Sequence, residues 1–187
     1  MAGKLVRLDP STGRIVARVP IGRSADAVAV GEGSVWVVDT TDSTVIRIDP
    51  SSNRVIATLP IGGPAGIATG GFLNRVDPGT LGVVGEQLDD KIADLAAGGG
   101  AVWVVSRSGA IYRIDQATRE HKRFGIGIGA SSVAFGDGFV WVANPQDGTL
   151  SRVDAKTNSV DKRTTVGRGA TDLAVGERSV WLTFGGG

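Results

Sequence analysis

The side chains that could do chemistry in this chain are oxygen-bearing groups at the ends of short apolar segments. Carboxylate and amide oxygens are the ligands that Ca²⁺ and Mg²⁺ prefer. Such an ion is therefore one expectation, with Asp94 and Asp172 as its candidate ligands. The alternative is that these side chains cap loops and that no cofactor is present. The groups before small apolar runs are Asp26, Asp94, Ser131, Ser132, Thr171 and Asp172, and those after tryptophan-containing runs are Asp39, Asp42, Asn144 and Asp147.

Other reactive groups are scarce. The 187 residues include no cysteine, which excludes a disulfide framework and a thiolate metal site. The one histidine, His121, lies in the charged segment 119–123 and is expected to be a solvated surface side chain. The glycine clusters at 98–100 and 125–129 precede no predicted helix, as a dinucleotide-binding loop would require. We therefore assign no catalytic residue from the sequence.

Two short segments recur along the chain and indicate its architecture. An Arg-x-Asp segment occurs five times, at Arg7, Arg47, Arg75, Arg113 and Arg152. A Gly-rich turn followed by a Val-Trp pair recurs in 28–39, 95–106, 133–144 and 173–184. A period of about 40 residues built from short strands is typical of a β-propeller. The sequence thus predicts an all-β, five-bladed β-propeller as a single domain.

Each repeat is expected to form four antiparallel strands, A to D, from the axis outward. Strand A is small and apolar, B carries the tryptophan, C is the Arg-x-Asp strand, and D follows a polar turn. The third blade lacks the tryptophan strand, so it either has three strands or uses 81–91 as a nonstandard edge. The N-terminal C and D strands should close with the C-terminal A and B strands. The predicted blades are 172–184 with 4–21, then 24–61, 64–88, 92–128 and 131–167.

The residues present in every repeat are expected to be structural. The tryptophans should pack between neighbouring sheets, whereas a sugar-stacking platform would need an exposed ring. The aspartates of strand C should accept backbone N–H groups at the start of a turn, with Gly13, Asn53 and Asn158 at left-handed positions. The repeated arginines should pair with neighbouring carboxylates. The structural set is Trp36, Trp103, Trp141, Trp181, Asp9, Asp49, Asp77, Asp115 and Asp154.

The order of these segments resembles a known family over almost the whole chain except about 70–91. An Arg-Ile-Asp-Pro strand, a Thr/Ser-Gly/Asn turn and an Ala-Val-Gly-Glu-Gly-x-Val-Trp-Val segment are similar to bacterial propellers of the YVTN and streptogramin (virginiamycin B) lyase-like group. The lyase would imply opening of a cyclic lactone with a magnesium ion and a catalytic histidine. His121 is expected in an outermost strand and does not match that histidine, so the resemblance implies the fold and not this activity.

Composition narrows the class of function further. The 20 basic and 19 acidic side chains are scattered, which argues against a nucleic-acid or membrane surface. The N-terminus has no signal-peptide core, so we expect a soluble monomer, cytoplasmic or excised from an extracytoplasmic protein. The favoured function is a non-enzymatic binding or scaffold module with an unknown protein or small-molecule ligand on its loop face. The alternatives are a metal-dependent lyase or lactonase, and an engineered or excised propeller without activity.

Overall fold

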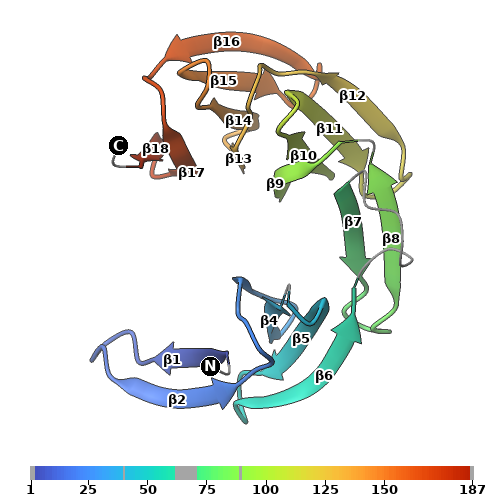
Figure 1. The fold of residues 1–187 in the computed structure, drawn as a ribbon, viewed down its shortest axis with the longest axis vertical. Coiled ribbons are helices and arrows are strands. Elements are labelled where there is room, and N and C mark those ends of the chain that lie inside the picture. Colours follow the sequence, from blue (N-terminus) through green and yellow to red (C-terminus); the bar gives the residue numbers. More distant parts are fainter. Residues whose placement is uncertain (1–2, 40, 62–70, 89, 186–187) are drawn as a thin grey trace. The chain divides into compact units, whose positions relative to one another are not determined.

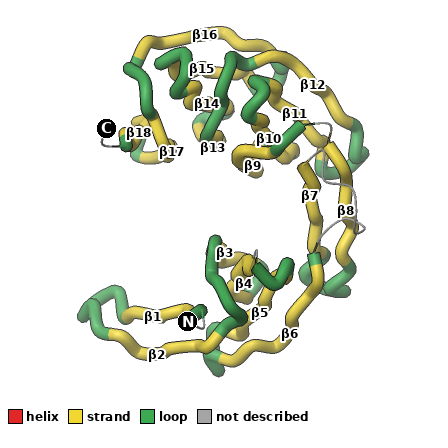
Figure 2. The backbone as a smooth tube through the Cα atoms, in the orientation of Figure 1, coloured by secondary structure: helices red, strands yellow, loops and turns green. Residues whose placement is uncertain are grey.

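The computed structural model describes residues 3–39, 41–61, 71–88 and 90–185, excluding the side chain of Phe72. All regular structure in these residues is β-strand, as Figure 1 and Figure 2 show. The strands pair in antiparallel sheets, which confirms the all-β prediction. Within the same described residues there is no helix that could cross a membrane.

The described residues divide into two compact units. The N-terminal unit holds the described residues up to 61 together with 72–87, and the C-terminal unit holds residue 71 and the described residues from 88 onward. The strands that lie wholly in the N-terminal unit, or in it but for one end residue, are β1 (Lys4–Leu8), β2 (Ile15–Pro20), β3 (Ala27–Gly31), β4 (Ser34–Asp39), β5 (Thr44–Asp49), β6 (Arg54–Pro60), β7 (Gly71–Val76) and β8 (Val83–Leu88).

The N-terminal unit contains one four-stranded sheet and two strand pairs. The sheet has the order β3-β4-β5-β6, which is the A-to-D order expected for 24–61. β1 pairs with β2, and β7 pairs with β8. The strand A expected before β7 falls in 62–70, outside the described residues, so the strand number of the third blade stays a prediction.

The C-terminal unit repeats the same arrangement twice and then adds a strand pair. Its sheets have the orders β12-β11-β10-β9, β13-β14-β15-β16 and β17-β18. Because β1–β2 and β17–β18 are each two-stranded sheets, the mixed blade and the count of five blades stay predictions. The strands are β9 (Ile92–Gly98), β10 (Ala101–Ser106), β11 (Ala110–Asp115), β12 (His121–Gly125), β13 (Ser132–Gly136), β14 (Phe139–Asn144), β15 (Thr149–Asp154), β16 (Ser159–Thr165), β17 (Ala170–Gly176) and β18 (Ser179–Phe184).

Tight turns with left-handed backbone join strands A and B. Glu32 and Gly33 have φ of 50° and 65°, and Asp137 and Gly138 have φ of 53° and 81°. Two successive positive φ values match the turn whose twist suits an antiparallel hairpin. The glycine that ends strand A also permits close packing, since a Cβ atom at Gly98 would clash with the ring of Phe135. The glycine-acid turns therefore fix both the hairpin and the spacing to the next sheet.

The strand C aspartates cap the turn that leads to strand D. Asp49 Oδ1 accepts the Ser51 N–H at 2.9 Å, and Asp154 Oδ1 accepts the Lys156 N–H at 2.8 Å. Asn53 and Asn158 lie at φ of 56° and 58°, as the sequence predicts. The other three caps bond in the same way, through Asp9, Asp77 and Asp115.

Acid should weaken the fold through these caps. Hydroxyl donation by Ser52 and Ser51 lowers the pKa of Asp49 from 3.8 to about 2, and turn hydrogen bonds lower the pKa of the other four caps as well. A carboxylate with a lowered pKa in the folded state stabilises it fully above pH 4, and that stability is lost as the pH falls towards 2. Urea unfolding from pH 6 to pH 2 should show the free energy of unfolding decreasing below pH 4.

The variant Asp49→Asn tests the assignment because it keeps the side chain's shape and removes the charge. Its stability should fall less steeply with acid than that of the unaltered chain. Asp137→Asn is the matched control, since Asp137 is exposed at a left-handed position that asparagine tolerates. An equal change in slope for both variants would contradict the role of the cap.

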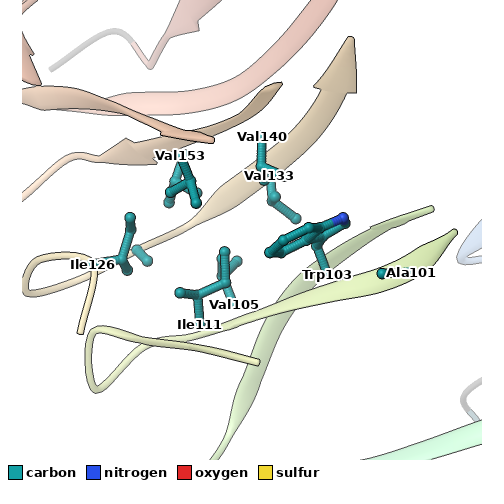
Figure 3. Packing of buried hydrophobic residues seen from close by; sticks show 10 residues of the cluster. Ala101, Trp103, Val105, Ile111, Ile126, Val133, Val140 and Val153 are labelled. Atoms are coloured by element: carbon teal, nitrogen blue, oxygen red, sulfur yellow. The ribbon is translucent and has the colours of Figure 1, made fainter. Parts of the chain in front are cut away.

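The core of the C-terminal unit lies between adjacent sheets. Trp103, Val105 and Ile111 of one sheet are fully buried against Val140 and Val153 of the next. Figure 3 shows the Trp103 ring pointing from β10 toward β14. The Trp103 indole N–H also donates to the Gly98 carbonyl at 3.1 Å, so both its ring and its polar atom have partners.

The other tryptophans are less covered than Trp103. Trp36 and Trp141 are half-buried, and Trp36 donates to the Gly31 carbonyl at 3.2 Å, as Trp103 does to Gly98. Trp181 departs from the expected packing because 64% of it is exposed. The sequence alone does not distinguish Trp181 from the others, since a tight turn and a valine precede the tryptophan in all four strands.

Apolar contacts also join two of the strand pairs, β1–β2 and β17–β18, to a neighbouring sheet. In the N-terminal unit, Val19 and Ile21 of the β1–β2 end pack against Val37, Ile46 and Ile48. In the C-terminal unit, the pair β17–β18 packs on the β13–β16 sheet through a cluster of small and branched residues. That cluster comprises Ala143, Leu150, Ala170 and Leu173, with Val180 and Leu182 at its margin.

The repeated arginines bond in two ways, and the expectation that all pair with carboxylates is wrong. Arg113 and Arg152 approach Asp115 and Asp161 at 3.3 and 2.6 Å. Arg7 instead donates to the Pro50 carbonyl at 2.6 Å, and Arg47 donates to the Pro78 carbonyl at 3.0 Å. In these two cases the arginine of one strand C holds the turn of the following repeat. Because every residue has a backbone carbonyl, the sequence does not show which one accepts from an arginine.

Candidate functional site

Three of the candidate residues meet at the starts of successive A strands. Asp94 lies in β9, Ser132 begins β13 and Asp172 lies in β17, so three consecutive repeats of the C-terminal unit each contribute one side chain. The Ser132 Oγ lies 3.1 Å from Asp94 Oδ2 and 2.8 Å from Asp172 Oδ1. We call these three residues the mouth cluster.

The backbone positions both carboxylates of the mouth cluster. Asp94 accepts the N–H groups of Leu95 and Val133 at 2.8 and 2.9 Å, and Asp172 accepts the Leu173 N–H at 2.8 Å. The strand register is irregular beside both aspartates, between Val105 and Ser106 and between Ala170 and Asp172. Such irregularities bend a strand and redirect its side chains. In this structure both irregularities lie next to the aspartates of the mouth cluster.

The mouth cluster has more acceptors than donors. Ser132 is almost fully buried and has one hydroxyl hydrogen, which it can donate to one carboxylate at a time. Asp94 is half-buried, whereas Asp172 is exposed. Among the described residues, nothing donates to Asp172 Oδ2. The cluster can therefore accept hydrogen bonds from a group outside the chain.

Asp39 caps a loop inside the N-terminal unit. Its carboxylate is fully buried and accepts the N–H groups of Asp42, Arg23 and Ser24 at 3.0, 2.8 and 3.1 Å. The Ser24 hydroxyl lies 2.7 Å from both Asp39 Oδ1 and Asp26 Oδ2. These hydrogen bonds, led by that of the Asp42 N–H, hold the pKa of Asp39 well below its usual range. Asp26 and Asp39 thus belong to one loop-fixing network.

Asn144 occupies the same repeat position as Asp39 but bonds differently. It is fully buried, and its amide nitrogen donates to Ser151 Oγ at 3.0 Å. Its Oδ1 atom is buried without a hydrogen-bond partner among the described residues. Asp147, from the same loop, accepts the Ile128 N–H at 3.2 Å. Asn144 thus joins β14 to β15, and Asp147 holds the connection between β12 and β13.

Thr171 and Ser131 are chain neighbours of mouth-cluster residues, but their hydroxyls bond elsewhere. The exposed Thr171 hydroxyl is 2.9 Å from that of Thr183, its cross-strand neighbour. The Ser131 hydroxyl donates to the Ala170 carbonyl at 3.4 Å. His121 is the first residue of β12, the outer strand of its sheet, as expected for a residue outside a central site.

One polar network was missed by the sequence analysis. Asp90 accepts hydrogen bonds from the hydroxyls of Ser108 and Tyr112, each at 2.7 Å, and from Arg123 at 3.0 Å. These donors, the Ser108 hydroxyl first, lower the pKa of Asp90, while burial raises the pKa of Tyr112. The network ties the segment before β9 to β11 and β12. Its members come from separated positions, and no motif marks them.

The donor set of the mouth cluster suits a hard cation only in part. Its carboxylate and hydroxyl oxygens are of the type that Ca²⁺ and Mg²⁺ bind. Within the described residues, no three histidine or acidic side chains gather as a metal site. The mouth cluster offers two carboxylates, so any further ligands of a cation there would have to be the Ser132 hydroxyl, water or substrate.

Comparisons with known proteins identify the fold. No protein-family model and no curated protein matches the chain. A solved structure of streptogramin B lyase matches 98% of this chain with 70% of its own, at 15% identity and a TM-score of 0.78. The Neurospora crassa Pan2 WD40 domain matches 92% of this chain with 62% of its own, at 12% identity and a TM-score of 0.71. The chain therefore has a β-propeller fold like that of streptogramin B lyase, as its repeats predict.

Proposed function

We propose that the chain is a non-enzymatic binding module whose mouth cluster receives a ligand rich in hydrogen-bond donors. One observation carries the proposal: two carboxylates of different repeats converge on the single hydroxyl of Ser132, at 3.1 and 2.8 Å. An exposed carboxylate oxygen of Asp172 remains available to an amine or hydroxyl group. Asp39 is fully buried and both of its oxygens accept hydrogen bonds from its own loops, whereas Asp172 is exposed, which favours the mouth cluster.

The mouth cluster presents two carboxylates in a fixed orientation. The backbone N–H groups of Leu95, Val133 and Leu173 hold the two carboxylates in place before a ligand arrives. Such preorganisation lowers the entropy lost on binding. A ligand donor at Asp172 would add a charge-assisted hydrogen bond, which is stronger than a neutral one. These features favour binding over catalysis.

A second candidate function is that of a metal-dependent lyase or lactonase. The observation that favours it is the same pair of carboxylates, because Asp94 and Asp172 could hold Mg²⁺ or Ca²⁺ with Ser132 and water. Such an ion polarises a carbonyl oxygen as a Lewis acid. The likeness to streptogramin B lyase is a likeness of fold, and it adds no residue to this candidate.

Thermal melts after chelator treatment test the two functions together. The probes are Mg²⁺, Ca²⁺, Mn²⁺, a diamine and a hexose, each raised to saturation. A ligand at 100 times its Kd stabilises the folded state by about 2.7 kcal/mol, so Tm should rise by several degrees. A rise with the diamine or hexose supports the binding module, and a rise with one metal ion supports the lyase or lactonase.

Asp172→Asn should abolish the rise because it removes the exposed charge of the mouth cluster. Asp137→Asn, an exposed aspartate in a hairpin turn, is the control for net charge and should leave the rise unchanged. If no probe changes Tm, or if the rise survives in Asp172→Asn, the mouth cluster is not the binding site and both proposals fail.

A further inference from the structure

A pocket with a volume of about 350 Å³ lies within the N-terminal unit, where the β1–β2 hairpin meets the turn between β5 and β6. Small-molecule sites in proteins have volumes of roughly 300–1,000 Å³. The walls combine a guanidinium group with uncovered apolar side chains, since Leu8 and Val16 are each 55% exposed. We call this site the Arg7 pocket. The residues that line it are Arg7, Leu8, Asp9, Pro10, Val16 and Asn53.

The guanidinium of Arg7 is held through one of its three nitrogen atoms. Its Nη1 atom donates to the Pro50 carbonyl at 2.6 Å and to Asn53 Oδ1 at 3.1 Å. No described residue accepts a hydrogen bond from its Nε or Nη2 atom. These two adjacent nitrogens form the edge of a guanidinium that matches the two oxygens of a carboxylate. The contacts of Nη1 therefore orient Arg7 before a ligand arrives.

The C-terminal unit contains the same arrangement with a carboxylate in place. The β15–β16 register skips one residue beside Arg152, and the extra residue of this bulge is Asp161. Arg152 donates from Nε and Nη2 to the two carboxylate oxygens of Asp161, at 3.0 and 2.6 Å. The β1–β2 register skips one residue beside Arg7 in the same way, and the extra residue there is Val16. Valine at this position leaves Arg7 without the carboxylate that Arg152 has.

The aspartate that also lines the pocket does not oppose a carboxylate ligand. Asp9 lies two residues after Arg7, and Asp154 lies two residues after Arg152. Both aspartates use Oδ1 to accept backbone N–H groups of their own turns. Arg152 binds the carboxylate of Asp161 although Asp154 is nearby. Arg7 can therefore bind a second carboxylate in the presence of Asp9.

We propose that the Arg7 pocket binds a small organic anion, a carboxylate with a short aliphatic chain. The carboxylate accepts hydrogen bonds from Nε and Nη2 of Arg7, and the chain covers Leu8 and Val16. The charge-assisted pair orients the ligand. The chain adds affinity in proportion to the apolar area removed from water. The Arg7 pocket shares no residue with the mouth cluster, so the proposal stands or falls independently of the function proposed there.

Titration of the full chain with pentanoate, followed by heteronuclear NMR, tests the proposal. The Nε–H resonance of Arg7 and the amide resonances of Leu8 and Val16 should shift saturably. Pentanol has the same chain without the charge, and acetate has the charge without most of the chain. Each should bind about tenfold more weakly than pentanoate, because each lacks one of the two contributions.

The variant Val16→Asp should close the site from within. It supplies to Arg7 the carboxylate that Asp161 supplies to Arg152, so pentanoate should no longer shift the Arg7 Nε–H resonance. Ile56→Asp is the matched control, because Ile56 is the extra residue of the β5–β6 bulge and is 53% exposed. Both variants add one negative charge to an exposed bulge, and Ile56→Asp should leave pentanoate binding unchanged.

The variant Arg7→Lys keeps the charge and removes the pair of adjacent N–H groups. It should weaken pentanoate binding about tenfold, and urea unfolding checks that the chain remains folded. The absence of saturable shifts at Arg7 would overturn the proposal. Equal binding of pentanol and pentanoate would do so as well, since the guanidinium would then play no part. Equal weakening by Val16→Asp and Ile56→Asp would show general repulsion of anions in place of a defined site.

Discussion

Replacing Trp103 with alanine should lower the free energy of unfolding of the C-terminal unit by about 3–5 kcal/mol. Trp103 is fully buried between two sheets, so its loss leaves a cavity among Val105, Val133 and Val140. The Gly98 carbonyl also loses the hydrogen bond that it accepts from the indole. The cavity and the lost hydrogen bond both reduce stability.

Trp181→Ala is the matched control for this variant, since the two tryptophans share one repeat position. Trp181 is largely exposed, so its replacement should change the free energy of unfolding by no more than about 0.5 kcal/mol. Urea unfolding followed by circular dichroism measures both values. A loss at Trp181 as large as that at Trp103 would contradict the exposed environment of the Trp181 side chain.

The strands could be predicted from the sequence because their limits are local chemistry. The turn after Asp49 needs a carboxylate acceptor and a left-handed residue, and the sequence supplies Ser51 and Asn53 in the right places. The hairpin at Glu32 and Gly33 needs two positive φ values, which the glycine-acid turn accommodates. Each of these requirements is met within four or five residues, so it can be read without knowing the rest of the fold.

The candidate site could be predicted only in part because its geometry depends on neighbouring repeats. The sequence offers Asp94 and Asp172 as candidate ligands of one ion, and in the structure both lie within hydrogen-bonding distance of Ser132. The buried Asp39 was an equally good candidate by residue type, but its carboxylate is engaged by loop N–H groups. The loop conformation decides which carboxylates accept backbone N–H groups. The sequence gives the residue types but not that conformation.

The Asp90 network shows the same limit more strongly. Asp90, Ser108, Tyr112 and Arg123 lie in different parts of the blade and meet only because β11 and β12 pair in register. Tyr112 pairs with Arg123 across these strands. A repeat pattern reveals what the blades share, whereas this network belongs to one blade. Features that distinguish one repeat from another are therefore the ones that the periodic analysis misses.

Removing residues 1–21, which include β1 and β2, should abolish cooperative unfolding of the N-terminal unit. Val19 and Ile21 pack directly on Val37, Ile46 and Ile48, whose exposures are 0%, 3% and 1%. Uncovering a branched apolar side chain costs about 1.5–3 kcal/mol. The sum over three such residues is comparable to the whole stability of a domain, about 5–15 kcal/mol. The β3–β6 sheet should therefore lose its transition, and its amides should exchange rapidly.

Controls are needed to show that the truncation acts by uncovering this core and not merely by shortening the chain. Val16→Ser is a useful control in the same hairpin, because Val16 is 55% exposed and its replacement should leave the transition intact. Val19→Ala should give an intermediate loss, since it removes part of the contact with the β4 and β5 residues. Thermal melts and amide exchange of β4 and β5 measure all three. A truncated chain that melts at the temperature of the full chain would show that β1 and β2 do not hold this core together.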